Sequence, residues 1–130
     1  MVFIDTHAHI DGEEFDLDRD EMVARARDAG AEAILVPAIN MEGLDKLRSV
    51  VKSYPGFAYA MIGLHPEDVR SDWREVIAEM RRIQESSPSE FIAIGEVGLD
   101  FYWSREYEHE QLECFEEQVR WAIEARLPLV

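Results

Sequence analysis

Short apolar runs recur along the chain at a spacing of about 30 residues, the length of a strand–helix unit. Each run is too short to form a helix and is rich in Val, Ile, Ala or Phe, as buried strands of parallel sheets are. The runs predict strands at Val2–Ile4, Ala33–Val36, Ala58–Ile62 and Phe91–Ile94, and a fifth begins at Leu129–Val130.

Amphipathic stretches with a helical period lie between these runs. We expect helices over about 18–29, 41–52, 71–87 and 104–125, and Asp72 and Glu75 have the spacing of a capping box at the start of the third. Strands that alternate with helices in this way build parallel α/β sheets. A doubly wound sheet and half of an eight-stranded barrel both fit, because a full barrel typically needs roughly 250 residues.

The composition narrows the range of partners. The 130 residues include 13 Lys plus Arg and 28 Asp plus Glu, so the net charge is −15. Such a chain repels nucleic-acid backbones and anionic membranes at long range, although bound cations can reverse the sign inside a pocket. The single cysteine, Cys114, is expected to be a buried, inert thiol. With no apparent signal peptide or spanning segment, we expect a cytoplasmic protein.

Polar residues that could carry chemistry follow the first predicted strand. Asp5, His7 and His9 alternate along an extended segment, so they could share one face at the carboxyl end of the strand. Two imidazoles at this spacing can bind one divalent cation, and the carboxylate could orient one of them. A short His-x-His pattern also occurs by chance in surface loops. Its position directly after a strand favours the metal-binding interpretation, since active sites of α/β proteins lie there.

Two further candidates follow later strands. Glu96 comes directly after the run Phe91–Ile94, where a carboxylate must be solvated, paired or bound to metal. His65 follows the run Ala58–Ile62, and Pro66 favours an extended conformation that could point it toward His7 and His9. The ordinary alternatives are that Glu96 is a loop carboxylate that reaches water and that His65 is a packed histidine.

Other residues are expected to have structural roles. His109 lies among glutamates on the last predicted helix, where a solvated side chain is the simplest interpretation. Gly95 and Gly98 would allow close backbone approach or an ordinary turn. Tyr102 and Trp103 follow the Glu96 loop and could border a pocket. No P-loop, dinucleotide-binding glycine turn or serine-nucleophile elbow is present, which removes the commonest nucleotide-binding and serine-hydrolase functions.

Three motifs in this order closely resemble the signatures of the TatD family of deoxyribonucleases. They are Phe-Ile-Asp-Thr-His-Ala-His at 3–9, Gly-Leu-His-Pro at 63–66 and Gly-Glu-Val-Gly-Leu-Asp-Phe-Tyr at 95–102, and Gln111, Phe115, Gln118 and Leu127–Pro128 add to the likeness. The resemblance covers the whole chain. It implies a metal-dependent hydrolase with a TIM-barrel fold, of which about four βα units with parallel strands, the first half, lie in residues 1–130.

The resemblance also implies roles for individual residues. His7 and His9 would bind a metal ion, Glu96 would bind or bridge metal ions, and His65 would contact the substrate phosphate. Asp5, on the spacing argument above, and Asp100, on the family motif, would have supporting roles. The family uses divalent metal ions, so two ions of zinc, magnesium or manganese are expected, and the expected partner is DNA rather than a membrane.

The sequence departs from the family in two places. Glu67 stands where the family often has a second histidine, so any phosphate contact made there is in doubt. The chain also stops at Val130, before the further histidines and the catalytic aspartate of the family, so no catalytic residue is identified in this half. We therefore expect a half-barrel, truncated before the fifth unit, with unpaired strand edges that favour self-association.

The expected function is hydrolysis of DNA phosphodiester bonds, by an exonuclease. Barrels with His-x-His after the first strand also hydrolyse small esters, lactones and amides, because fold does not fix substrate. A half-barrel without the later ligands could also be inactive.

Overall fold

The protein, in a computed structural model that describes residues 1–130, contains one parallel sheet of four strands. The strands are β1 (Phe3–Asp5), β2 (Ala31–Val36), β3 (Ala58–Ile62) and β4 (Phe91–Ile94). Their order in space is their order in the sequence, and all three neighbouring pairs are parallel. A doubly wound sheet would reverse direction at a switch point. The sequential order is that of a barrel, so the expected half of a TIM (β/α)8 barrel is confirmed.

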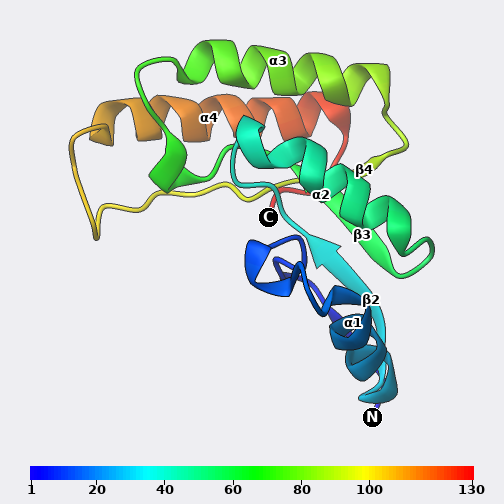
Figure 1. Ribbon diagram of the computed structural model, residues 1–130. Helices are drawn as coiled ribbons and strands as arrows, with labels where there is room; N and C mark the ends of the chain where they lie inside the picture. The colour runs from blue at the N-terminus through cyan, green and yellow to red at the C-terminus, as the bar shows by residue number, and fades with distance from the viewer.

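One helix follows each strand along the chain (Figure 1). They are α1 (Arg19–Asp28), α2 (Met41–Ser53), α3 (Trp73–Ser86) and α4 (Glu108–Ala125), with short 3-10 turns at Glu13–Phe15 and Pro66–Asp68. The hydrophobic core joins strand residues such as Val36 and Ile62 to helix residues such as Leu44, Met80 and Trp121. No helix is long and apolar enough to cross a membrane.

The fifth apolar run lies where the next strand of a barrel would lie. Leu129 forms a parallel bridge with Ile94 of β4. The Ile94 amide donates to the Pro128 carbonyl over 2.8 Å, and the Val130 amide donates to the Ile94 carbonyl over 2.9 Å. The outer side of β4 is therefore paired, whereas β1 has β2 as its one neighbour.

Three local predictions were wrong. Val2 and Ile4 are exposed rather than buried, because β1 lies at the edge of the sheet. The last helix begins at Glu108 rather than near Ser104, whose hydroxyl instead accepts a hydrogen bond from the Glu106 amide in a turn. Asp72 precedes α3, but its side chain caps no backbone amide, so the capping box does not form.

The helical cysteine behaves as expected. Cys114 is fully buried in α4, and burial raises the pKa of its thiol to about 12. A thiol with so high a pKa carries almost no thiolate at neutral pH, so it is a poor nucleophile.

Candidate metal centre

The segment that carries His7 and His9 continues from β1 along the end of β2. The Asp5 carboxylate accepts a hydrogen bond from the His7 amide over 3.0 Å, which turns the chain at the end of the strand. The Ala8 amide then donates to the Leu35 carbonyl. Asp5 thus supports the site by shaping the backbone, not by holding an imidazole.

The backbone beyond His9 is held by one arginine of α1. Arg19 donates from Nε to the Ile10 carbonyl over 2.7 Å and from Nη2 to the Gly12 carbonyl over 2.8 Å. A rigid guanidinium that binds several carbonyl oxygens fixes the shape of a loop. The position of His9 therefore depends on a residue ten positions further along the chain.

His65 lies in the loop after β3, where the backbone is held from two sides. Its amide donates to the Ile39 carbonyl over 2.8 Å, and the adjacent Leu64 pairs with the Gln118 side chain of α4. The ring Nδ1 accepts a hydrogen bond from the Glu67 amide over 3.1 Å. This bond leaves Nε2 of His65 to face the site.

Glu96 lies directly after β4, in backbone that bridges to the loop after β2. The Glu96 amide donates to the Ala38 carbonyl over 3.0 Å, and the Ala38 amide donates to the Gly95 carbonyl over 3.1 Å. Gly95 has little room for a side chain, since a Cβ there would lie 3.0 Å from the Met61 sulfur. Of the two possibilities that the sequence left open for this glycine, close approach is the one that the structure has.

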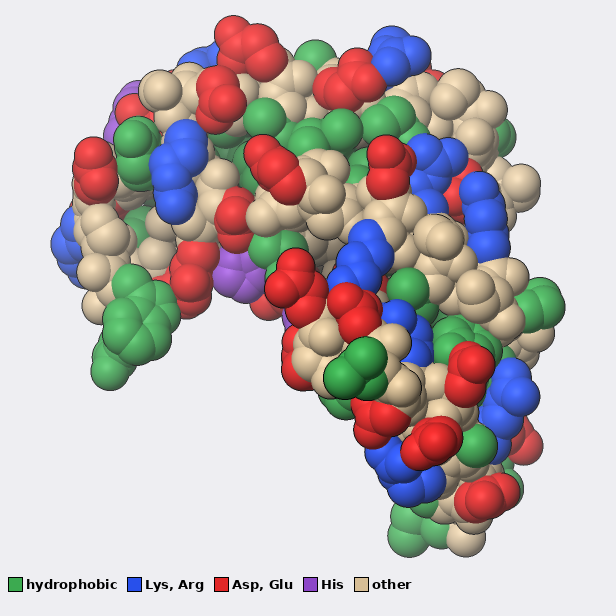
Figure 2. Space-filling model, viewed as in Figure 1, with side chains coloured by type: hydrophobic (Ala, Val, Ile, Leu, Met, Phe, Trp, Pro, Cys, Tyr) green, Lys and Arg blue, Asp and Glu red, His purple; other side chains and the backbone are tan.

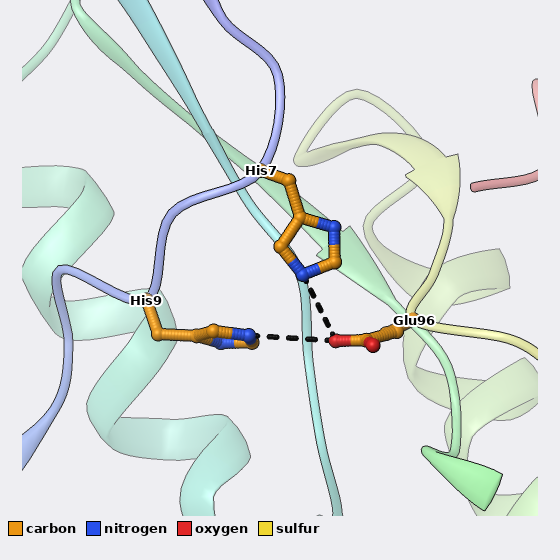
Figure 3. A group of neighbouring side chains, drawn as sticks. All are labelled: His7, His9 and Glu96. Carbon is orange, nitrogen blue, oxygen red and sulfur yellow. Dashed lines mark ion pairs between the residues drawn. The ribbon is translucent and has the colours of Figure 1, made fainter. Parts of the chain in front are cut away.

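The three loops bring their side chains together around the Glu96 carboxylate. Figure 3 shows His7 and His9 pointing toward this carboxylate. Nε2 of His7 and Nε2 of His9 lie 3.0 and 3.4 Å from Glu96 Oε2. Nε2 of His65 lies 3.2 Å from the other oxygen, Oε1. The rings of His7 and His9 meet edge to face, 5.1 Å apart. The structure thus assembles all four residues to which the sequence assigned metal or substrate contacts.

The chemistry of this group suits a divalent cation. His7, His9 and Glu96 offer two imidazole nitrogens and a carboxylate oxygen, all within 4.8 Å of one another. These are zinc and transition-metal ligands, and the carboxylate also suits magnesium and manganese. All three side chains are partly exposed, so the group is open to solvent and substrate. Figure 2 shows histidine side chains on the concave side of an arch-shaped molecule.

One residue beside the site was not singled out from the sequence. Nδ1 of His9 and Oδ1 of Asp11 are both buried without a hydrogen-bond partner. Burial raises the pKa of the Asp11 carboxyl, and the nearby His9 acts against that shift. In the sequence, Asp11 begins an acidic stretch over 11–20 that is indistinguishable from an ordinary loop and helix start.

The loop after Glu96 is held by the last helix. Gln111 of α4 accepts from the Asp100 amide and donates to the Asp100 carbonyl, both over 2.9 Å. The Asp100 carboxylate accepts a hydrogen bond from the Tyr102 amide over 2.9 Å. Asp100 therefore shapes this loop.

Four parallel βα units in sequential order, with a His–His–Glu group at the carboxyl ends of β1 and β4, define a half-barrel with a candidate metal centre. The family model for the TatD-related DNases matches residues 4–130. The chain belongs to that family.

Individual relatives agree with this assignment. The chain is 34% identical over 130 residues to an uncharacterized metal-dependent hydrolase, YabD, of Bacillus subtilis, covering 100% of this chain and 49% of YabD. It is 38% identical over 125 residues to the 3'-5' ssDNA/RNA exonuclease TatD of Cronobacter turicensis, covering 96% of this chain and 46% of that protein. The chain thus spans about half the length of the curated relatives it matches.

The fold also matches solved structures. The crystal structure of YjjV, a TatD homolog from Escherichia coli, superposes with a TM-score of 0.86 at 32% identity and covers 98% of this chain and 49% of its own. A TatD family hydrolase from Entamoeba histolytica superposes with a TM-score of 0.82 at 21% identity, covering 99% of this chain and 48% of its own. The second likeness supports the fold alone.

Proposed function

We propose that this chain supplies one part of the active site of a divalent-metal-dependent hydrolase that cleaves phosphodiester bonds in DNA, as an exonuclease on single strands. The observation that carries the proposal is the convergence of His7, His9 and Glu96 from opposite ends of the sheet. Family membership and the nuclease names of relatives support the choice of substrate.

His7, His9 and Glu96 would hold the metal. Three ligands from this chain leave coordination positions for water, substrate and further side chains, and the two oxygens of Glu96 would allow it to touch a second ion. We propose two ions, of zinc, magnesium or manganese. When bound, they would polarise the phosphodiester and lower the pKa of water.

His65 suits a different task, which its hydrogen bonds indicate. A neutral imidazole carries one proton, and Nδ1 of His65 already accepts a bond from the Glu67 amide. In the neutral ring the proton would then be on Nε2, the atom 3.2 Å from Glu96. A protonated nitrogen cannot ligate a metal, but it can donate to a phosphate oxygen. We propose that His65 binds the substrate phosphate.

The charge of the chain makes metal ions necessary for binding as well. A net charge of −15 and a carboxylate at the centre of the site repel an approaching phosphate. Cations bound by the His–His–Glu group would make the local electrostatic potential positive. DNA affinity should therefore depend on divalent metal ions.

The first test compares this chain with a His7→Ala/His9→Ala variant. Manganese binding is measured by calorimetry, and cleavage of labelled single-stranded DNA is followed with magnesium or manganese. His109→Ala is the matched control, because His109 is exposed on α4 and pairs with Glu113 away from the site. We expect the double variant to lose manganese binding and any cleavage, while the control retains both.

The outcomes separate the alternatives. Cleavage of small esters, lactones or amides in place of DNA would change the substrate class while keeping the metal centre. Manganese binding without cleavage of any substrate would assign this chain the ligands and place the rest of the chemistry in residues it lacks. Equal manganese binding by the wild type and the double variant would refute the proposed centre.

We also propose a location in the cytoplasm. The one cysteine, Cys114, is buried and reduced, so the fold needs no disulfide and tolerates a reducing compartment.

A further inference from the structure

Two large aromatic side chains project into solvent from the loop between β4 and α4. Tyr102 is 81% exposed and Trp103 is 75% exposed, while the other two tryptophans, Trp73 and Trp121, are buried. The rings of Tyr102 and Trp103 lie 4.7 Å apart and nearly perpendicular. Contiguous exposed hydrophobic surface marks interaction sites, whereas single exposed hydrophobic residues are ordinary.

This loop is ordered by its own contacts. Gln111 of α4 forms two hydrogen bonds with the backbone of Asp100. The Asp100 carboxylate accepts a hydrogen bond from the Tyr102 amide. The Arg105 guanidinium lies 5.0 Å from the centre of the Phe101 ring. The two aromatic side chains are thus presented from a fixed backbone.

A cavity of about 290 Å³ lies beside Trp103, whose ring contacts that of Tyr102. Its lining includes Trp103 and Tyr107 from the loop between β4 and α4. Glu67 and Asp100 also line it, and the Glu67 amide donates a hydrogen bond to Nδ1 of His65. One residue of the cavity is therefore in direct contact with a residue of the proposed site.

The cavity also contains one arginine, Arg70, which forms no ion pair although Glu67, Asp100 and Glu106 line the same cavity. Arg70 uses Nη1 to donate to two backbone carbonyl oxygens of its own turn, over 2.6 and 2.9 Å. Its guanidinium lies 5.4 Å from the Tyr107 ring. In contrast to Arg105, which pairs with Glu108, Arg70 pairs with no acidic side chain. In so acidic a chain, this arginine is available to a phosphate.

We propose that Tyr102, Trp103 and Arg70 form a subsite for single-stranded nucleic acid, in which the aromatic rings stack on a base and Arg70 pairs with a backbone phosphate. The inference rests on the proposed function, because the strand would extend from a phosphate held at His65 and the metal group. Stacking requires an open base face, which a single strand offers and a duplex hides. The rings would accept any base, since every base has an aromatic face.

Equilibrium binding in calcium tests the subsite without a need for turnover. The probes are a short dT oligonucleotide and an abasic strand of the same length. The wild type should bind the dT strand roughly tenfold more tightly, the order of one stacked base. A Tyr102→Ala/Trp103→Ala variant should bind both strands alike. Ile123→Ala, which removes an exposed hydrophobic side chain from α4, is the matched control and should behave as the wild type.

Two further measurements follow from the same geometry. Trp103 is the exposed tryptophan, so the dT strand should quench tryptophan fluorescence and the abasic strand should not. Arg70→Ala should weaken the binding of both strands equally and reduce the slope of log affinity against log salt by about 0.7.

The subsite would be overturned if the wild type bound both strands equally, or if the aromatic variant kept the preference for dT. It would also be overturned if Trp103 fluorescence changed with protein concentration and not with DNA, since a second copy would then cover the rings. Metal-dependent cleavage by a wild type that binds the dT and abasic strands equally would refute the subsite and leave the proposed function standing. Base-dependent binding without metal-dependent cleavage would support the subsite and refute the proposed function.

Discussion

Two buried glutamines act on the backbone of the site rather than on a substrate. Gln118 accepts from the Leu64 amide and donates to the Leu64 carbonyl, over 2.9 and 3.1 Å. Gln111, two helical turns earlier, makes the same pair of bonds to Asp100. A primary amide offers a donor and an acceptor side by side, so each glutamine satisfies both backbone groups of one loop residue. α4 therefore fixes the loops that follow β3 and β4.

Replacing Gln118 with leucine should destabilise the protein strongly. The Gln118→Leu variant leaves a buried amide and carbonyl of Leu64 unpaired, and the cost should be about 2–4 kcal/mol of unfolding free energy. Urea denaturation followed by circular dichroism measures it. Glu116→Leu is the matched control on the same helix, because Glu116 is exposed, and it should change stability by less than about 0.5 kcal/mol. Equal effects of the two variants would contradict the proposed role.

Glu96 is the residue on which the metal centre depends most. The Glu96→Gln variant keeps the size of the side chain but removes the charge between the imidazoles, so manganese affinity should fall by at least about tenfold. Calorimetry with manganese measures this. Glu67→Gln is the control, since Glu67 is exposed and lies outside the His–His–Glu group. A larger loss in the Glu67 variant would move the centre toward Glu67.

At the scale of elements, the site depends on how closely the ends of β3 and β4 approach. A Cβ at Gly63 would lie 3.0 Å from the backbone N and C of Gly95 and 3.1 Å from the Gln118 amide oxygen. The Gly95 amide donates to the Ile62 carbonyl over 3.0 Å, which holds the two strand ends in this contact. A side chain at Gly63 would push apart the loops that carry His65 and Glu96.

Two glycine-to-alanine changes should therefore have opposite effects on the free energy of unfolding. Gly63→Ala should lower the free energy of unfolding by about 1–3 kcal/mol, because the neighbouring backbone must shift. Gly43→Ala should raise it by up to about 1 kcal/mol, since alanine favours a helix. Gly43 is exposed in α2, and its amide bond to the Asn40 side chain would be kept. Thermal and urea unfolding measure both, and a neutral Gly63→Ala variant would show that the strand ends are not tightly packed.

The sequence predicted which strands and helices form better than it predicted which of them lie next to one another. The strand–helix alternation and the convergence of His7, His65 and Glu96 follow from local periodicity and from the geometry of strand ends. Local pattern could not choose between barrel and doubly wound sheet, because that depends on which strands pair. It also could not distinguish the buried amide of Gln118 or the unpaired Arg70 from ordinary surface residues. Those roles arise only when distant segments meet.

At the scale of the whole molecule, the edge of the sheet and the net charge act against each other. Val2, which precedes β1, and Ile4 of β1 are 66% and 57% exposed, and β1 has an unpaired edge. Such edges promote association between copies. The charge of −15 opposes it, because identical copies repel one another. Salt screens the repulsion and leaves the hydrophobic attraction in place.

We therefore expect this chain to self-associate, and to do so more strongly as salt increases. Sedimentation velocity over a range of protein and salt concentrations measures the mass. A Val2→Lys/Ile4→Lys variant should shift the population toward monomer, because it places charges on the exposed edge strand. Leu17→Lys is the control, since Leu17 is fully exposed outside β1 and the variant adds one positive charge where the edge variant adds two. A wild type that stays monomeric at high concentration and high salt would refute self-association. If Leu17→Lys had as large an effect as the edge variant, charge rather than the β1 edge would control the association.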